Sequence, residues 1–418
     1  MSTVFELDET VVTTAVRAVT PASDLTQTDV AERFARAAWT AIAEPGDRHA
    51  GMVVKALGAA AALTALIGTV DGAGLRRVLL DSGGDDIPVK ELQTAIDRWA
   101  PRLKSSEVVT ALTQAARYEV TLLVPSDTDW PTGFDDLGLH APLAVWVRGN
   151  LSTLSTLDRS IALVGARAAT GYGEHVTMEA SAGLVDRGYT IVSGAAYGID
   201  GMAHRAALAS SGQTLAFLAG GVDRFYPSGH DALLTRIVDT GAVVSELPCG
   251  SSPTKWRFLQ RNRLIAASSL ATIVLEAGWR SGSLNTAGHA ASLGRPLGAV
   301  PGPVTSAASA GCHRLIREYD ATCVTNADQM AELAPLAGTS VGAPIDPVAM
   351  PPAGSVAALT SDTVRVLDAL STRAPRIAED IAARAGLSVV AVRAVLGTLE
   401  LGGTVVERDR GWLRKNAG

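Results

Sequence analysis

The segment IALVGARAATGYG, from Ile161 to Gly173, places an apolar run directly before a loop of small residues. Four consecutive apolar residues predict a strand that is buried on both faces, and a glycine-containing loop after it is typical of a strand-to-helix turn. Similar short apolar runs recur as far as Val324, separated by segments of helical character. This alternation predicts βαβ units with right-handed crossovers, and therefore an α/β fold with an extended Rossmann-like parallel sheet.

Working outward from Ile161, the same pattern predicts further strands on both sides. Two strand-like runs precede the segment, at Val120–Val124 and Leu143–Val147, and the later ones are Thr190–Val192, Thr214–Leu218, Ala242–Val244, Ala271–Leu275, Leu297–Val300 and Thr322–Val324. Most of them are followed by loops of small residues or glycine. Because ligands of open α/β sheets bind beyond the carboxyl ends of the strands, we expect these loops to converge on one site.

The length of 418 residues suggests about three domains of roughly 100–200 residues each. Residues 1–118 predict a helical N-terminal domain, whose role is open between DNA-binding helical hairpins, partner docking and scaffolding. Residues 119–334 hold the sheet, and residues 335–355 form a linker rich in Ala, Pro and Gly. The order of helical and strand-like segments in residues 356–418 predicts a winged helix that flanks the sheet on its C-terminal side.

The composition restricts the class of protein. Hydrophobic residues make up 47% and charged residues 19% of the chain, which is typical of a globular protein with large cores. The net charge of −6 argues against a surface coated in nucleic acid, so any DNA contact must be local. Three cysteines without Cys-x-x-Cys spacing predict neither a disulfide framework nor a metal site, and we expect no cofactor.

The location expected from the sequence is the cytoplasm, without membrane attachment. Acidic residues occupy the N-terminus where a secretory signal would carry Lys or Arg. The longest apolar stretch, Met52 to Val70, is interrupted by Lys55 and Thr64, so we interpret it as one buried helix and not as a membrane span.

The segment KWRFLQRNR, from Lys255 to Arg263, interleaves cations with aromatic residues ahead of an apolar helix. Cations can follow the phosphates of a single strand while an aromatic face stacks on a base, and Lys255 and Phe258 are the strongest candidates for these roles. Arg261 and Arg263 would point in nearly opposite directions on a helix, so one of them could instead brace a loop. The alternative is that the arginines lie over the sheet or pair with distant carboxylates, and that Trp256 and Phe258 are core residues.

Three loops complete the expected site. Arg167 lies with several backbone amides at a helix N-terminus, which favours a phosphate, although a simple tight turn is the alternative. The small residues Ser193 and Gly194 would let a ligand approach closely, and the loop with Ser281 and Gly282 offers hydroxyl and amide donors.

A catalytic interpretation is weaker. Ser193, Asp200 and His204 lack a Gly-x-Ser-x-Gly elbow, and Asp200 is better placed as the N-cap of a helix that starts near Gly201. Glu276 lacks a partner acid, so we interpret it as a carboxylate that braces a loop and could pair with a nearby arginine. The alternative function is a Rossmann-like nucleotide or N-glycoside hydrolase that uses Glu276.

Together these segments resemble the DprA (Smf) family of DNA-processing proteins. The resemblance rests on ordered motifs that include Val164-Gly165-Ala166-Arg167, Tyr226-Pro227, Ser245-Glu246, Arg261-Asn262-Arg263 and Gly311-Cys312. It implies sequence-independent binding of single-stranded DNA, loading of the RecA recombinase onto it in natural transformation or recombination, self-association into a homodimer, and no catalysis. The DNA-binding residues expected are Arg167, Ser193, Gly194, Lys255, Phe258, Gln260, Arg261, Asn262, Arg263, Ser281 and Gly282.

The winged helix carries a weaker nucleic-acid signal. Its presumed recognition helix, Ser388 to Leu401, offers only Arg393 as a cation, which favours a protein contact. A nucleic-acid role stays open because the wing is basic, with Arg408, Arg410, Arg414 and Lys415.

Overall fold

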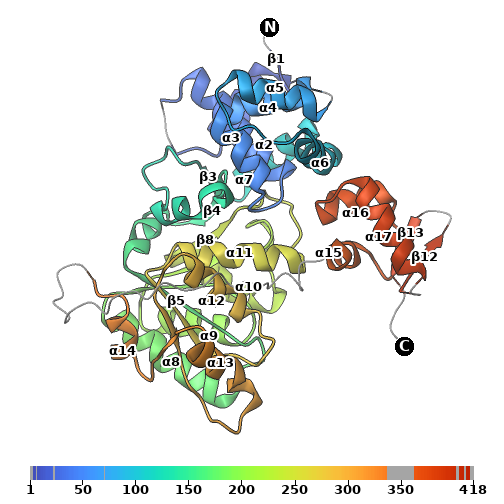
Figure 1. Cartoon of the computed structure of the whole chain (residues 1–418). Helices are drawn as coiled ribbons and strands as arrows, with labels where there is room; N and C mark the ends of the chain where they lie inside the picture. Colours follow the sequence, from blue (N-terminus) through green and yellow to red (C-terminus); the bar gives the residue numbers. More distant parts are fainter. Residues whose placement is uncertain are drawn as a thin grey trace.

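The computed structural model describes residues 3–5, 7–21, 24–69, 71–336, 362–401, 404–408 and 411–414. A helical N-terminal region, a nine-stranded sheet with helices on both faces, and a winged-helix region follow one another along the chain (Figure 1). The expected fold class is therefore confirmed. Most of the predicted linker, together with Arg410 and Lys415 of the wing, lies outside the described residues.

The N-terminal region begins with a short antiparallel hairpin and continues as helices. Its elements are β1 (Thr3–Val4), β2 (Leu7–Asp8), α1 (Glu9–Arg17), α2 (Gln27–Ile42), α3 (Arg48–Leu57), α4 (Ala59–Gly68), α5 (Gly72–Asp81), α6 (Val89–Trp99), the 3-10 turn η1 (Ala100–Arg102) and α7 (Ser105–Arg117). Side-chain caps fix several helix starts. Thr26 and Asp29 form a capping box on α2, and Asp47 accepts from two amides of α3.

The apolar stretch from Met52 was predicted to be one buried helix, and this was wrong. It divides into α3 and α4, which meet at Gly58 with a bend of 109°. Gly58 has a φ of 79°, a backbone conformation that glycine adopts without steric cost. No single helix in the described part of the chain is long and apolar enough to cross a bilayer; α3 and α4 together would pass on length and composition, but they are sharply bent.

The sheet has the strand order β11-β10-β9-β5-β6-β7-β8-β4-β3. Its strands are β3 (Val120–Leu123), β4 (Val145–Gly149), β5 (Ser160–Gly165), β6 (Thr190–Ser193), β7 (Thr214–Phe217), β8 (Ala242–Ser245), β9 (Ala271–Glu276), β10 (Leu297–Ala299) and β11 (Thr322–Cys323). The strands from β11 to β8 are parallel, as predicted, but β4 is antiparallel to both of its neighbours. Only a 3-10 segment, at Thr132–His140, lies between β3 and β4, and antiparallel neighbours do not need a crossover helix.

Alternate residues of the central strands face the two helical layers. Ile161 and Leu163 pack beneath α8 (Gly171–Asp186), α9 (Ile199–Ala209) and α14 (Ala327–Glu332). Ala162 and Val164 face the opposite layer, which contains α11 (Lys255–Ala267), α12 (Ser283–Ser292), α13 (Ala310–Glu318) and the 3-10 segments η2 (Thr132–His140) and η3 (Leu151–Arg159). The helix α10 (Asp231–Thr240) and the short turns η4 (Ser228–His230) and η5 (Ala307–Ser309) complete the connections.

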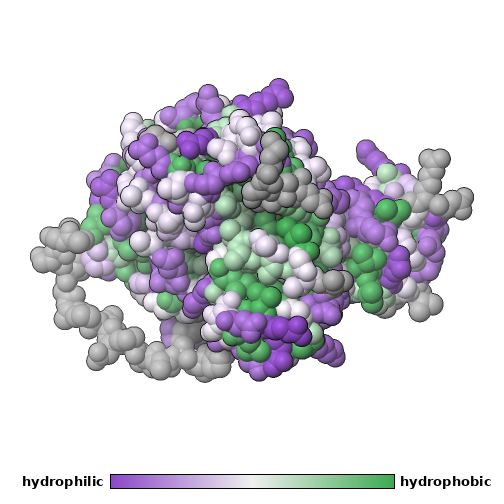
Figure 2. All heavy atoms as spheres, turned by 90° about the horizontal axis from the view of Figure 1, so that it is seen from above, coloured by the Kyte–Doolittle hydropathy of each residue, from purple (hydrophilic) through white to green (hydrophobic). Residues whose placement is uncertain are grey.

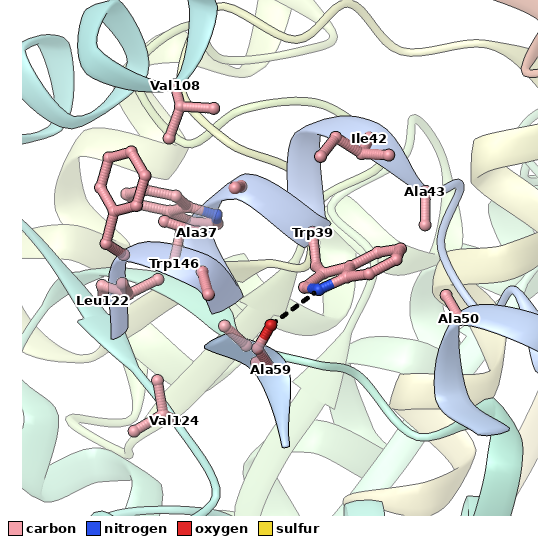
Figure 3. Packing of buried hydrophobic residues seen from close by; sticks show 14 of the residues in the cluster. Ala37, Trp39, Ile42, Ala43, Ala50, Ala59, Val108, Leu122, Val124 and Trp146 are labelled. Carbon is pink, nitrogen blue, oxygen red and sulfur yellow. Dashed lines mark hydrogen bonds between the residues drawn. The ribbon is translucent and has the colours of Figure 1, made fainter. Parts of the chain in front are cut away.

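The N-terminal helices and one edge of the sheet share a single hydrophobic core. Trp39 of α2 packs in the same buried cluster as Trp146 of β4 and Leu122 of β3 (Figure 3). Two hydrogen bonds orient the indoles: Trp39 Nε1 donates to Ala59 O at 3.2 Å, and Trp146 Nε1 donates to Thr40 Oγ1 at 3.2 Å. Because these side chains come from both regions, the helices are packed onto the sheet as one body.

The winged-helix region has a hydrophobic core of its own. It contains α15 (Asp362–Ala369), α16 (Ala378–Ala385), α17 (Val389–Leu401) and the antiparallel pair β12 (Val405–Arg408) and β13 (Gly411–Arg414). It stands at one side of the molecule, where α15 lies beside α11 and α16 lies beside η1 (Figure 1). The view from above shows the same region projecting sideways from the rest (Figure 2).

Candidate nucleic-acid interface

A cavity of about 480 Å³ opens beyond the carboxyl end of β5. The loops after β5, β6 and β9 reach it together with one side of α11, as expected for a sheet whose loops converge. Five of the described residues that line it are cations and one is a carboxylate, namely Arg167, Lys255, Arg261, Arg280, Arg365 and Asp200. The cavity is therefore suited to an anionic ligand.

The helix α11 begins earlier than the sequence suggested. Lys255 is its first residue, and Thr254 caps it by accepting from the amide of Arg257 at 3.3 Å. Lys255 and Phe258 therefore lie three residues apart on one helix, where side chains share a face. Both line the cavity, and the Lys255 side chain is 72% exposed. A cation and an aromatic ring thus meet at the mouth of the same pocket.

Phe258 is half-buried and has polar and aromatic neighbours. The guanidinium of Arg167 lies 4.8 Å from the centre of its ring, and that of Arg261 lies 5.8 Å away. The ring of Tyr226, which is 48% exposed, lies 5.6 Å from Phe258 at a tilt of 53°. A base that stacks here would meet cations on the same surface, which is the combination typical of single-strand binding.

Arg261 braces the floor of the cavity. Its Nη1 donates to Gly194 O at 2.6 Å and to Phe217 O at 2.5 Å, so it ties together the ends of β6 and β7. Burial lowers its pKa to about 10, and the nearby carboxylate of Asp200 offsets part of this shift. Arg261 is therefore charged at neutral pH. A Cβ on Gly194 would collide with the guanidinium, so a larger residue there would displace this brace.

Arg263 and Gln260 point away from the cavity, toward the N-terminal region. Arg263 is 3% exposed; its Nη2 lies 2.7 Å from the carboxylate of Glu246, and its Nε donates to His140 O at 2.9 Å. The Gln260 side chain lies beside Gly46. Arg261 and Arg263 point in different directions, as expected. Both side chains brace the protein, although only one of them was expected to do so.

The remaining expected residues divide between the cavity and the core. Asn262 Nδ2 donates to Asn285 Oδ1 at 3.2 Å and lies 3.5 Å from Gly282 O, which holds the loop that carries Ser281 and Gly282 against α11. Ser281 and Gly282 both line the cavity. Ser193 is fully buried, and its hydroxyl donates to Leu163 O at 2.6 Å, so it offers no hydroxyl to a ligand.

Glu276 braces a loop, but its partner is a threonine where an arginine was considered. Its two carboxylate oxygens accept from Thr170, one from the hydroxyl at 2.6 Å and one from the backbone amide at 2.9 Å. Thr170 in turn caps α8 through Gly173 N. Glu276 is 2% exposed and does not appear among the described residues that line the cavity. The geometry therefore gives no support to a hydrolase that uses this carboxylate.

Ser193, Asp200 and His204 do not form a catalytic set. Asp200 lies inside α9 instead of capping it, because the helix begins at Ile199 after Gly198, so the predicted N-cap was wrong. Burial raises the pKa of Asp200, although Arg261 opposes the shift. His204 Nδ1 lies 2.7 Å from Thr214 Oγ1, away from Ser193.

Burial lowers the pKa of His204 to about 3, with His230 and Arg261 adding to the shift. Between pH 6.5 and 3 the unfolded chain therefore binds a proton that the folded chain excludes. We expect the free energy of unfolding to fall with decreasing pH in this window, by about 1.4 kcal/mol per pH unit from this group. Urea denaturation at pH 6, 5 and 4 measures the slope, and His204→Gln should reduce it by about 1.4 kcal/mol per pH unit. An unchanged slope in the variant would contradict this origin.

Two residues of the cavity region were missed in the sequence. Tyr226 was noted only as part of a Tyr-Pro motif. Its position as an aromatic residue in a loop after a strand could have indicated that it lies near the site. Arg365 belongs to the winged helix, and nothing in its local sequence indicates that it lines a pocket together with Trp256, which lies 109 positions earlier in the chain.

Two models of known protein families match the sequence of this chain. The family model described as DNA recombination-mediator protein A matches residues 121–335, which is just over half of the chain. The chain belongs to the DprA family. A second model, the DprA winged helix domain, matches residues 350–409. The protein is thus a member of a family of DNA-processing and recombination-mediator proteins.

Individual DprA relatives agree with this assignment. A DNA processing protein DprA of Mycobacterium tuberculosis is 45% identical over 310 residues, covering 71% of this chain and 78% of its own. The Streptococcus pneumoniae DprA is 39% identical over 192 residues, covering 46% of this chain and 67% of its own.

Solved DprA structures are also similar. The X-ray structure of the Streptococcus pneumoniae protein matches with a TM-score of 0.52 at 29% identity, over 64% of this chain and 94% of that one. A DNA processing protein A from Helicobacter pylori, studied for its single-stranded DNA binding mode, gives a TM-score of 0.47 at 28% identity, over 51% of this chain and 94% of that one.

Proposed function

We propose that this DprA-family protein binds single-stranded DNA without sequence specificity, at the cavity beyond β5, in the cytoplasm. The observation that carries the proposal is the Phe258 ring, which has the Arg167 guanidinium 4.8 Å from its centre and lines the same cation-lined pocket as Lys255. A half-buried aromatic ring can stack on any base, and adjacent cations can pair with the flanking phosphates. Ser281 and Gly282 line the same cavity and complete the proposed contact surface.

In this proposal the expected site residues have different roles, which the contacts described above support. Arg167, Lys255, Phe258, Ser281 and Gly282 are the direct contacts. Arg261, Gly194 and Asn262 hold the loops in place, and Ser193, Gln260 and Arg263 support the fold.

The same proposal includes delivery of the bound strand to the RecA recombinase and assembly into a homodimer, in natural transformation or recombination. Membership of a recombination-mediator family supports this step. Exchange of a single-strand binding protein for RecA on a fluorescent oligonucleotide, timed with and without this protein, tests the delivery. An unchanged rate of exchange would oppose it, and analytical ultracentrifugation measures the dimer.

DNA binding itself is tested by titrating labelled single-stranded and duplex oligonucleotides at several salt concentrations. We expect much tighter binding of the single strand, with a log–log salt slope of about −0.7 per phosphate contact. Lys255→Ala and Phe258→Ala should both weaken binding, but only Lys255→Ala should flatten the slope, because only lysine carries a charge. Equal affinity for duplex, or no effect of either substitution, would refute the assignment of the site.

A further inference from the structure

The winged-helix region is seated on the helix that carries the proposed DNA contacts. Asp368 of α15 accepts from the backbone amide of Lys255 at 3.0 Å, and its other oxygen lies 3.8 Å from Lys255 Nζ. Arg365, one turn earlier, has its guanidinium 4.9 Å from the centre of the Trp256 ring. Val364 and Arg365 both line the cavity. The described part of α15 therefore covers the first turn of α11.

The position of Asp368 is one that an anion would otherwise occupy. The N-terminus of a helix favours negative charge through its dipole and its free amides, and Lys255 adds a positive side chain at the same place. The Asp368 side chain is 12% exposed, against 72% for Lys255. A carboxylate from the same chain thus sits where a DNA phosphate would find both an amide and a cation.

A second contact fixes this seating through a buried carboxylate. Glu44, in the loop after α2, pairs with Arg102 of η1 and accepts from Arg257 of α11 at 3.0 Å. Burial alone would raise the pKa of Glu44, but Arg102, Arg257 and Arg365 hold it well below its ordinary value. Arg102 and Arg257 therefore pair with Glu44 directly, and Arg365 of the winged helix adds a positive charge nearby.

The winged helix also contacts this cluster directly. Arg102 Nε donates to Ala383 O at 2.5 Å, and Arg365 Nη2 donates to Gly386 O at 2.9 Å. Gly386 has a φ of 64°, and a Cβ there would collide with Glu44. The Arg102–Ala383 bond and the approach of Gly386 to Glu44 hold the winged helix beside the N-terminal region, and the Arg365–Gly386 bond holds α15 inside the winged helix, where it lies on α11.

We propose that this face of the winged helix is an interaction surface whose partner is α11 of the same chain, and that Asp368 competes there with DNA phosphate. The inference rests on the proposed DNA site. Single-stranded DNA would bind fully only when α15 leaves α11, so the measured affinity is lowered by the fraction of molecules that are docked. Substitutions that weaken the contact between α15 and α11 should therefore increase the affinity for single-stranded DNA.

The opposite arrangement, in which the winged helix closes over bound DNA and Arg365 contacts it, gives opposite results. Arg365→Ala removes a positive charge from the cavity wall. If Arg365 contacts DNA, the loss of its charge weakens DNA binding. If Arg365 instead holds α15 against α11, its loss strengthens DNA binding despite the lost charge. The sign of the change therefore separates the two arrangements.

The decisive experiment measures the affinity of the full chain for a labelled oligo(dT) by fluorescence anisotropy at one salt concentration. We expect Asp368→Asn and Arg365→Ala to bind about 3- to 10-fold more tightly than the native chain. Asp380→Asn is the control, because Asp380 pairs with Arg384 inside the winged helix and its loss changes the net charge equally. It should shift the affinity less than 2-fold. In a Lys255→Ala background, the gain from Asp368→Asn should largely disappear.

Unchanged or weaker binding by both Asp368→Asn and Arg365→Ala, while the native chain binds, overturns the competition and leaves the DNA site standing. Absence of binding by every variant instead removes the proposed function, and this inference with it. Energy transfer supplies a second readout, from dyes on cysteines introduced at Lys90 and Val390 in a Cys323→Ser background. Added oligonucleotide should lower the transfer efficiency, and an unchanged efficiency on saturation with DNA contradicts release.

Discussion

Replacing Phe258 with alanine should weaken the binding of single-stranded DNA by roughly 5- to 150-fold, because stacking on an aromatic side chain contributes about 1–3 kcal/mol per base. The ring also supports the guanidinium of Arg167 at 4.8 Å, so its removal takes away the surface on which that cation rests. Fluorescence anisotropy with a labelled oligonucleotide measures the loss. The salt slope should stay as in the native chain.

Two further variants sharpen this test. Phe258→Trp keeps an aromatic face and should recover most of the affinity. Trp279→Ala removes a 57% exposed aromatic side chain that does not line the cavity, and it should leave the affinity nearly unchanged. A loss below 2-fold for Phe258→Ala, or an equal loss for Trp279→Ala, would show that the strand is held elsewhere.

Replacing Arg263 with methionine should lower the free energy of unfolding by about 3–5 kcal/mol, because it leaves the buried carboxylate of Glu246 without its cation. The pair is nearly inaccessible, with side chains 3% and 9% exposed. Arg263 also donates to His140 O and Gln260 O, so the substitution removes three donors at once. Urea denaturation followed by tryptophan fluorescence measures the change.

The controls for Arg263 are another arginine and a double substitution. Arg76 forms an exposed pair with Asp86, and Arg76→Met should cost no more than about 1 kcal/mol. Adding Glu246→Leu to Arg263→Met should restore much of the lost stability, because no charge then stays buried and unpaired. If Arg263→Met instead reduced DNA affinity of the folded protein and left stability unchanged, Arg263 would be a DNA contact after all.

The sheet could be predicted because its signals are local. Each central strand is a short apolar run followed by small residues, and burial on both faces requires that pattern. The strand direction at the edge of the sheet was harder to predict, because the antiparallel orientation of β4 depends on its pairing with β8, which no local pattern encodes. The break at Gly58 was missed for a related reason, because apolar composition continues through it on both sides.

The sequence predicted which kinds of side chain form the candidate site, but not which of them face the cavity and which hold the fold together. The segment from Lys255 to Arg263 indicated cations beside an aromatic ring, and helical spacing separated Arg261 from Arg263. The sequence could not show that carbonyl groups of Gly194 and Phe217 engage Arg261, or that Glu246 engages Arg263, because these partners come from distant strands. The contact of Asp368 with Lys255 was equally invisible, since it joins residues 113 positions apart.

The shared core at the edge of the sheet affects how the protein can be divided for experiments. Trp146, Leu122 and Val243 lie under the N-terminal helices and are almost completely shielded from water. A chain that starts at residue 119 would expose these side chains together, and contiguous exposed apolar surface promotes aggregation. Loss of activity after such a truncation would therefore report failed folding. The contribution of the helices to DNA binding is better measured by surface substitutions that leave this shared core intact.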